Sequence, residues 1–527
     1  MSGPVESHAE LVARDDAHLR SLGIKPELQR RLGFLSNFAV AFSYISVSTG
    51  TYTLIALGLG VGGPAFFWSW PIVILGQTFV ALNFAELASH FPVAGSIYQW
   101  SKRLSSRTLG WFTGWFYFWA GVVTVTAVAG TVPLVMSSIF GFDLAAKSPI
   151  GIVNNLVFWA IVTLVVTTVI NAFGVRLLAV INNIGVAAEI LGMLVFALIL
   201  LIFANHQSPA VLFETAHVET PETGGYLPVF AVAMFMSLFV VYGFDTAGTF
   251  GEETLDAGRQ APRGILSAIW LSGIVGAVFL LAIILATPDM AAALKDPSPI
   301  STAIKSGLGD TFGNVYLFVI LAAVAVCTLA IQGATTRLMF SMGRDRRMPL
   351  GSLWGSVNHT FKTPANAAVA VGVLAAIPFF VTDNPGLLAT GATGLIYLSY
   401  LLCNIGVLIA RLRGWPRQPA WFKLGGWGLV VNILALVWGG LMTINFALWQ
   451  DPGLFGNFGS ALRANTNPSL TGVKSGGNPI SWLPDIPFYE ATVILILVTG
   501  LIYYLVTQVR RQDVIEADQA TGEAIIG

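Results

Sequence analysis

The chain has 527 residues, of which 55% are hydrophobic and only 10% are charged, and its mean hydropathy is +0.74. Soluble domains carry about 25% charged residues, so this composition predicts a membrane-embedded protein. The formal net charge is zero and the pI is about 7.0, which gives no basis for a nucleic-acid partner. The two cysteines, Cys327 and Cys403, each lie in an apolar run, so we expect buried small hydrophobes and no disulfide framework.

The head of the chain, residues 1–35, mixes acidic and basic side chains. It holds no basic stretch that is followed by an apolar one, so we expect no cleaved signal peptide. The first apolar segment is then its own insertion signal, and the head is a short cytoplasmic segment.

Twelve segments are apolar enough to cross a bilayer, because a helix needs roughly 20 apolar residues to span about 30 Å of hydrocarbon. The sequence therefore predicts an all-α polytopic membrane protein. The division between the fourth and fifth segments depends only on Asn171–Gly174 and Arg176. The twelve segments are 36–60, 63–90, 108–138, 150–173, 175–204, 226–254, 263–287, 312–340, 364–382, 386–411, 427–449 and 487–509.

The positions of the lysines and arginines predict the orientation. If the N-terminus is inside, only five of the 27 lie in outer loops, namely Lys147, Lys295, Lys305, Arg463 and Lys474. Such a bias towards the inner side is the usual sign of cytoplasmic loops. We therefore expect a cell-membrane protein with both termini in the cytoplasm, including the tail 510–527, and with loops 205–225 and 450–486 facing outward.

Small and polar residues interrupt the first and sixth segments. In hydrocarbon an unsatisfied peptide group costs several kcal/mol, so such a point persists only beside protein or a water-filled cavity. Close helix packing is the alternative, since Ser, Thr and Gly are common at helix interfaces. Two interruptions five segments apart favour a central cavity, as in transporters that are built from inverted repeats. The interrupting residues are Ser46, Ser48, Thr49, Gly50 and Thr51 in the first segment, and Tyr242, Gly243, Phe244 and Asp245 in the sixth.

A set of short motifs, spread over residues 36–410, resembles the amino acid–polyamine–organocation transporter superfamily, and most closely its amino acid/choline/GABA permease branch. The resemblance implies a LeuT-like fold, which is a five-plus-five inverted repeat with broken first and sixth helices and two peripheral helices. The repeats would cover 36–204 and 226–411 within a core of 36–411, with the peripheral helices in 412–509. The motifs are Gly62–Pro64, Ala85–Ala88 with Pro92–Tyr98, Gly243–Asp245 with Glu252–Thr254, Ala261–Gly264, and Arg337–Pro349.

The resemblance also implies roles for the two interruptions. In this superfamily, backbone donors and hydroxyls at the first break hold a substrate carboxylate, and the match here is best at Ser48-Thr49-Gly50, where Ser and Thr stand in place of the usual glycines. Carbonyl groups at the sixth break, here Tyr242–Asp245, hold the amino group. Asp245 has three interpretations: it contacts a substrate ammonium, it titrates during transport, or it caps the second half of the sixth helix.

Coupling and gating residues follow from similar arguments. Glu189 lies in the middle of the fifth segment, where proton-coupled relatives carry a lysine, and burial disfavours the charged form of a carboxyl group, so we expect Glu189 to exchange a proton. A structural Glu paired with a hydroxyl or Arg is the alternative. Sodium coupling is the competing scheme, with hydroxyl ligands from Thr335 and Thr336 beside Thr328. Candidate gating residues are Phe239, Glu252 and Arg337, although Arg337 also fits a simple positive-inside anchor.

Other functional classes are less consistent with the sequence. None of the six histidines lies well inside a segment, no lysine lies mid-segment, and no Walker-type motif is present, so we expect no enzyme, no metal site and no cofactor other than a coupling ion. The sequence predicts a secondary transporter of amino acids or related amines, with proton-coupled uptake. The alternatives are a substrate–product exchanger, a GABA, choline or polyamine transporter, and a membrane nutrient sensor that does not transport. The expected partners are one small molecule and the lipid bilayer, and the oligomeric state stays open.

Overall fold

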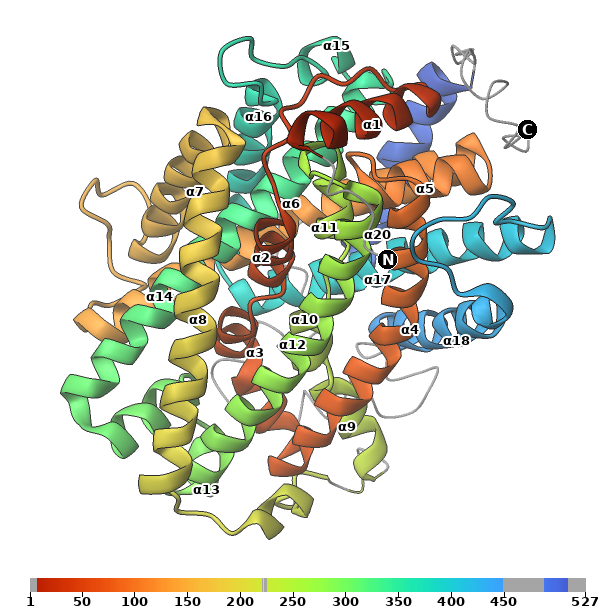
Figure 1. Cartoon of the computed structure of the whole chain (residues 1–527). Helices are drawn as coiled ribbons and strands as arrows, with labels where there is room; N and C mark the ends of the chain where they lie inside the picture. Colours follow the sequence, from red (N-terminus) through yellow and green to blue (C-terminus); the bar gives the residue numbers. More distant parts are fainter. Residues whose placement is uncertain (1–6, 220, 222–224, 449–487, 510–527) are drawn as a thin grey trace.

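The computed structural model describes residues 7–219, 221, 225–448 and 488–509 (Figure 1). Over these ranges the backbone is helical apart from loops and two isolated β-bridges. Ten of the helices in the described ranges are long and apolar enough to cross a membrane, and two shorter apolar helices occupy Tyr226–Val240 and Ala365–Phe380. The predicted outer loop 450–486 and the tail 510–527 lie outside the described residues.

The first half of the chain supplies the helices that lead up to the sixth predicted segment. They are α1 (His8–Ser21), α2 (Phe34–Ile45), α3 (Val47–Gly62), η1 (Pro64–Trp68), α4 (Ser69–His90), α5 (Ser96–Leu104), α6 (Arg107–Phe140), α7 (Asn155–Phe173), α8 (Val175–Phe203) and η2 (Pro209–Phe213). One helix ends at Phe173 and the next begins at Val175, so the fourth and fifth segments separate where Asn171–Gly174 predicts.

The second half begins with three short helices where one span is predicted, and then continues with long ones. They are α9 (Tyr226–Ala233), α10 (Phe235–Val240), α11 (Thr246–Thr249), η4 (Gly251–Glu253), α12 (Ala257–Ala286), α13 (Met290–Ala293), α14 (Pro299–Arg344), α15 (Gly351–Trp354), α16 (Ala365–Ala376), η5 (Ile377–Phe380), α17 (Pro385–Leu412), η6 (Gly425–Trp427), α18 (Gly428–Leu448), α20 (Phe488–Tyr503) and a π-helical turn (Tyr504–Gln508).

Burial separates central helices from peripheral ones. The span formed by α2 and α3 is 94% buried in its most apolar window, whereas the corresponding figure for α8 is 28%. Ile184, Leu191 and Leu198 of α8 are exposed, while Met193 and Ala197 of the same helix are buried. A helix with one apolar face outside and one inside is expected where lipid replaces water as the solvent. The broken helices are therefore surrounded by the rest of the bundle.

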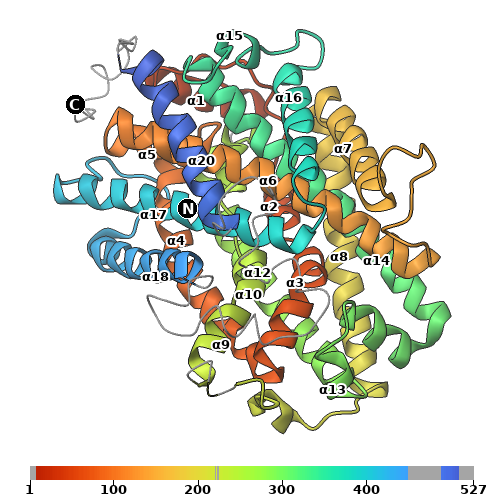
Figure 2. The ribbon, with the colours of Figure 1, turned by 180° about the vertical axis from the view of Figure 1, so that it is seen from behind.

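The two ends of the bundle differ in what they carry. Figures 1 and 2 show α1 and α15 at one end and α9 and α13 at the opposite end. The long helices α14 and α17 both pack on α6, and α12 packs on α2 and α4. These contacts hold α3 and α10, which also pack together, at the centre of the molecule.

Candidate functional site

The first span is broken at Ser46. Its φ of 31° and ψ of 88° put this residue in the left-handed region, and it separates α2 from α3. Serine adopts a positive φ rarely, so the surroundings must hold it there. The break falls at the edge of the predicted stretch: Ser48, Thr49 and Gly50, the best match by resemblance, are already helical in the first turns of α3. That part of the prediction was wrong, because the hydrogen bonds around Ser46 decide the conformation and the glycine does not.

Glu189 of α8 holds this break. Its Oε1 accepts hydrogen bonds from Ser46 Oγ at 2.8 Å, Ser48 Oγ at 2.7 Å and the Ser48 backbone N–H at 3.2 Å. Thr49 Oγ1 lies 2.6 Å from Ser46 Oγ and completes the cluster. The first N–H groups of a helix have no partner in the helix and carry positive partial charge, so a carboxyl group is favourable there. Glu189 therefore occupies the start of α3 as an external anion would.

The sixth segment is broken between α10 and α11. Gly243 has a φ of 86°, and a Cβ at this residue would overlap the ring of Tyr44, so both its conformation and its packing require glycine. The break frees backbone groups that side chains then satisfy. The Gly243 N–H donates to the Tyr400 hydroxyl at 2.9 Å, and Gln77 Nε2 donates to the Val241 carbonyl at 3.0 Å.

Asp245 is fully buried in this break and accepts three hydroxyl hydrogen bonds. The donors are Tyr400 at 2.6 Å, Tyr117 at 2.7 Å and Ser96 at 2.9 Å. Its side chain makes no capping hydrogen bond to α11, which contradicts the helix-cap interpretation. Asp245 instead joins α5, α6 and α17 to the sixth-segment break.

The two breaks face each other across the centre of the bundle. A Cβ added to Gly50 would lie 2.6 Å from Cγ2 of Val240, so α3 and α10 are in close contact. Tyr44, just before the first break, meets Tyr242 in an edge-to-face ring contact with a centroid distance of 6.1 Å. Each break also has a freed N–H that bonds to a side chain from another helix: Glu189 serves the first break and Tyr400 the sixth.

The other predicted site residues lie around this centre. Phe239 packs edge-on against Tyr242 at 5.8 Å, and Phe244 packs against Tyr400 at 5.6 Å. Thr51 is buried, and its hydroxyl has no hydrogen-bond partner among the described residues.

The hydroxyls of the candidate sodium ligands are hydrogen-bonded within their own helix. Thr335 and Thr336 are buried in α14, and their hydroxyls donate to the carbonyls of Ile331 and Gln332, one turn earlier in the same helix. Thr328 likewise donates to its own helix. These bonds account for the three hydroxyls within α14.

Ion pairs close the end of the bundle that carries α1. Arg337 donates to both carboxylate oxygens of Glu253, at 2.8 and 3.1 Å, and both side chains are at most 2% exposed. Arg344 makes a bidentate pair with Glu252 at 2.8 and 2.9 Å. The predicted gating residues Glu252 and Arg337 therefore lie in one cluster, although each is paired with a different residue. Lys102 of α5 adds a third pair, with Asp345, at 3.0 Å.

A cavity of about 440 Å³ opens towards the opposite end of the bundle. Tyr52 and Thr53, which lie on α3 beyond the break, form part of its lining, and Asp383 is its one charged residue among those described. The Tyr52 hydroxyl lies 2.7 Å from Ser138 Oγ of α6 and 2.8 Å from Ser301 Oγ of α14. These hydrogen bonds tie α3 to its neighbours at the cavity wall.

Sequence reasoning missed the residues that hold Asp245. Tyr117 belongs to an aromatic run that is typical of packing, Ser96 lies within the Pro92–Tyr98 motif without an assigned role, and Tyr400 carries no local signal. Tyr117, Tyr400 and Ser96 lie 128, 155 and 149 residues from Asp245 in the chain, so only the folded structure brings them together.

Known proteins with a similar sequence match most of the chain. The model of a family described as amino acid permease matches residues 32–463. The "Amino-acid permease BAT1 homolog" of Oryza sativa subsp. japonica is 30% identical over 461 residues, which cover 82% of this chain and 87% of that protein. "Amino-acid permease BAT1" of Arabidopsis thaliana is 28% identical, with 85% of this chain and 90% of that protein covered. "Branched-chain amino acid permease BcaP" of Bacillus subtilis is 25% identical, with 81% and 92% covered.

These relatives are named as permeases and not as enzymes. The apolar helices of the described residues agree with a protein that crosses the membrane many times. The chain therefore belongs to the amino acid permease family of the amino acid–polyamine–organocation superfamily.

Proposed function

We propose that this protein is a secondary active transporter of amino acids or related amines that works by alternating access. The observation that carries the proposal is the pair of broken helices whose breaks face each other and whose freed backbone groups are held by polar side chains. Discontinuous helices of this kind form the substrate sites of transporters with inverted repeats, near the middle of the bilayer.

The proposed fold has twelve crossings in a five-plus-five inverted repeat with two peripheral helices. An inverted repeat pairs the first span with the sixth and the fifth with the tenth. Glu189 of α8, in the fifth span, contacts the first break, and Tyr400 of α17, in the tenth, contacts the sixth. This correspondence supports the repeat, because the same pair of elements meets in each half of the molecule.

Substrate recognition is assigned to the two breaks. The start of α3 carries hydrogen-bond donors and positive partial charge, which suit a carboxylate, whereas carbonyl groups at the sixth break suit an ammonium group. Ser46, Ser48 and Thr49 supply the donors on one side. The carbonyls between Val241 and Gly243 are the acceptors on the other. Asp245 keeps the sixth break in shape through its three hydroxyl partners.

Glu189 is the proposed proton carrier, and its position suggests how proton and substrate are coupled. Its carboxylate holds the same Ser46 and Ser48 donors that a substrate carboxylate would use. Hydrogen bonds to an ionised acceptor are about twice as strong as neutral ones, so protonation of Glu189 weakens its hold on these donors. A substrate carboxylate then takes the place of the Glu189 charge, and one proton accompanies one substrate.

The ion-pair end is placed in the cytoplasm, as the distribution of basic residues predicts, and the membrane is the cell membrane. The chain would then be closed towards the cytoplasm by the Glu252 and Glu253 pairs and open towards the outside through the cavity beside Tyr52.

Counterflow in proteoliposomes tests the proposal. Purified protein is reconstituted into vesicles loaded with an unlabelled amino acid or amine, and the entry of the same labelled compound is followed. A panel of neutral, branched-chain and basic amino acids, GABA, choline and polyamines covers the substrate class. Labelled compound that accumulates transiently supports a transporter. Binding without flux for every ligand that raises the thermal stability of the protein would instead indicate a sensor.

A further inference from the structure

The N-terminal segment lies across the closed end of the bundle. Residues 8–33, which we call the N-terminal strap, consist of α1 and an extended stretch that leads into α2. The N–H groups of Arg31 and Leu32 both donate to the Glu253 carbonyl at 2.9 Å, and Leu255 N–H donates back to the Leu32 carbonyl at 2.9 Å. The strap is therefore hydrogen-bonded to the chain between α11 and α12.

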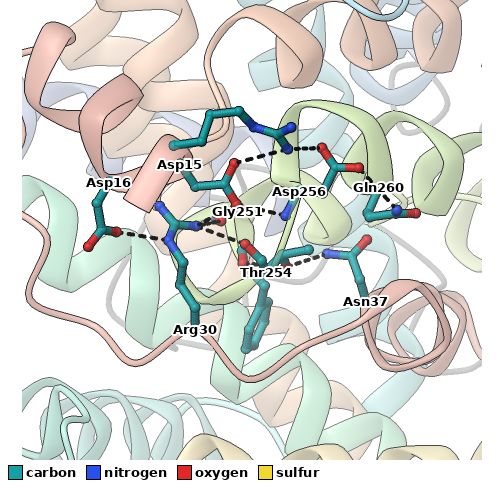
Figure 3. A network of polar contacts seen from close by, with 10 residues as sticks. Asp15, Asp16, Arg30, Asn37, Gly251, Thr254, Asp256 and Gln260 are labelled. Carbon is teal, nitrogen blue, oxygen red and sulfur yellow. Dashed lines mark hydrogen bonds and ion pairs between the residues drawn. The ribbon is translucent and has the colours of Figure 1, made fainter. Parts of the chain in front are cut away.

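Arg30 is the charged centre of this contact (Figure 3). Its side chain is only 4% exposed, so its charge must be satisfied within the protein. Its Nη1 donates to the carbonyls of Gly251 at 3.2 Å and Thr254 at 2.8 Å, while Nε donates to Asp16 at 3.0 Å. One guanidinium thus joins α1 to two carbonyls at the cytoplasmic end of the sixth span.

Four further hydrogen bonds hold this part of the chain, two from α1 and two from α2. Asp15 accepts the Asp256 N–H at 2.7 Å (Figure 3). Arg14 donates to the Asp256 carboxylate at 2.6 Å. From α2, Asn37 Nδ2 donates to the Ala247 carbonyl at 2.8 Å and to Thr254 Oγ1 at 2.9 Å. The half-helix that precedes the first break is therefore fastened to the half-helix that follows the sixth.

The underside of the strap is apolar. Leu19, Leu22, Ile24 and Leu32 are buried in the main hydrophobic core. Leu28 packs with Ala94 and with Phe340 of α14. The strap is thus packed against the core of the bundle.

Glu253 is the residue through which the strap meets the gate. Its backbone carbonyl accepts the two strap N–H groups, and its carboxylate accepts both hydrogen bonds from Arg337 of α14. A buried bidentate pair depends strongly on geometry, so whatever fixes the backbone at Glu253 also fixes this pair.

We propose that Arg30 is a positioning residue of the cytoplasmic gate. It fastens residues 251–256 to the strap and to α2, so that the cytoplasmic halves of the first and sixth spans move as one unit. In the closed state it keeps Glu253 aligned with Arg337. This inference depends on the proposed function only in treating this end as the gate of an alternating-access transporter.

Arg31 provides a matched control. It follows Arg30 directly, its side chain is exposed, and it bonds to Glu253 through its backbone. Arg31→Ala therefore removes a positive charge from the strap without touching the carbonyls of Gly251 and Thr254. Arg30→Lys keeps the charge of Arg30 but loses the planar, multiple donors of the guanidinium.

Reaction of Cys327 with a small, charged thiol reagent tests the proposal in the full chain. Cys327 is 2% exposed, and its Sγ lies 3.6 Å from the Tyr44 carbonyl, beside the first break. Cys403→Ser removes the other thiol. Labelling is measured separately in vesicles that expose the cytoplasmic face and in vesicles that expose the outer face of the protein. In each preparation the reagent reaches Cys327 from one known side of the membrane.

Arg30→Ala is expected to raise the rate of labelling from the cytoplasmic side about tenfold and to lower the rate from the outer side. The reason is that a loss of about 1.4 kcal/mol in the stability of the state closed to the cytoplasm shifts the population of that state tenfold. Arg31→Ala should match the parent, and Arg30→Lys should lie between. Rates that rise equally from both sides would mean general loosening and would overturn the proposal, as would equal rates in the Arg30 and Arg31 variants. If Arg30→Ala does not yield folded protein, the labelling rates of Arg30→Lys and Arg31→Ala are compared instead, and equal rates would overturn the proposal. Labelling needs no substrate, so a failure to transport leaves this result unaffected.

Discussion

Replacement of Glu189 by glutamine separates the structural and the coupling roles of this residue. Gln keeps an acceptor oxygen for Ser46 Oγ, Ser48 Oγ and the Ser48 N–H, but it removes the charge. Hydrogen bonds to a charged group are worth about 1.5–3 kcal/mol and neutral ones about 0.5–1.5 kcal/mol. A charge at a helix N-terminus adds about 0.3–1 kcal/mol. We therefore expect Glu189→Gln to lower the free energy of unfolding by about 1–3 kcal/mol and to leave the protein folded.

The transport assay separates accumulation from exchange. Proteoliposomes with an inward pH gradient measure accumulation, and counterflow at equal pH on both sides measures exchange. Glu189→Gln cannot take up and release a proton, so it should lose accumulation driven by the pH gradient while retaining counterflow. Glu189→Asp keeps a carboxyl group one methylene shorter and should retain part of the accumulation. Full gradient-driven accumulation by Glu189→Gln would refute the role of Glu189 as proton carrier.

Three further predictions follow from other contacts. Tyr400→Phe removes one hydrogen bond to the buried Asp245 carboxylate and also the acceptor of the Gly243 N–H. We therefore expect the free energy of unfolding, measured by thermal denaturation, to fall by about 2–4.5 kcal/mol, together with slower counterflow; an unchanged melting temperature would contradict this. Burial raises the pKa of Asp345, but the positive charges beside it outweigh burial and hold the pKa below its ordinary value of 3.8. Asp345→Asn should therefore destabilise the protein by about 1–2 kcal/mol at pH 7, and this difference should disappear as the pH falls through the lowered pKa; a difference that persisted in stronger acid would exclude the ion pair as its source. Asp383→Asn should raise KM for positively charged substrates about three- to tenfold, because it removes the one charge among the described residues that line the outer cavity. Asp310→Asn changes an exposed carboxylate outside that lining and should leave KM unchanged. Equal effects of the two substitutions would argue against the cavity as the entrance.

The sequence could predict the weak points of the fold but not their geometry. Gly243 was identifiable because a glycine beside a lone carboxylate marks a weak point in an apolar segment, and Gly243 does adopt a positive φ. In the first segment the interruption was predicted at Ser46–Thr51, and the resemblance favoured Ser48–Gly50. Gly50 is helical, however, and allows close packing against Val240. Ser46 carries the unusual backbone because Glu189 bonds to it, and a contact over 143 residues leaves no local trace in the chain.

The charged residues show the same limit. Glu252 and Arg337 could be assigned to one end of the bundle from span boundaries and from the distribution of basic residues. The pairing of each glutamate with its arginine could not be predicted from the sequence. Glu252 and Glu253 are neighbours, and the turn between α11 and α12 decides where each side chain points. The strap was missed for a different reason: a polar segment outside the apolar spans gives no periodic signal, although Arg30 within it is buried.

A structure with bound substrate would test the central claim most directly. A thermal-shift screen first identifies an amino acid or amine that stabilises the protein, and a cryo-EM map of that complex then locates the ligand. We predict density between Ser46–Thr49 and Val241–Gly243, with the ligand carboxylate at the start of α3 and its ammonium group near the carbonyls of the sixth break. A ligand bound elsewhere, with the Ser46, Ser48 and Glu189 cluster unchanged, would contradict a substrate site between the two breaks.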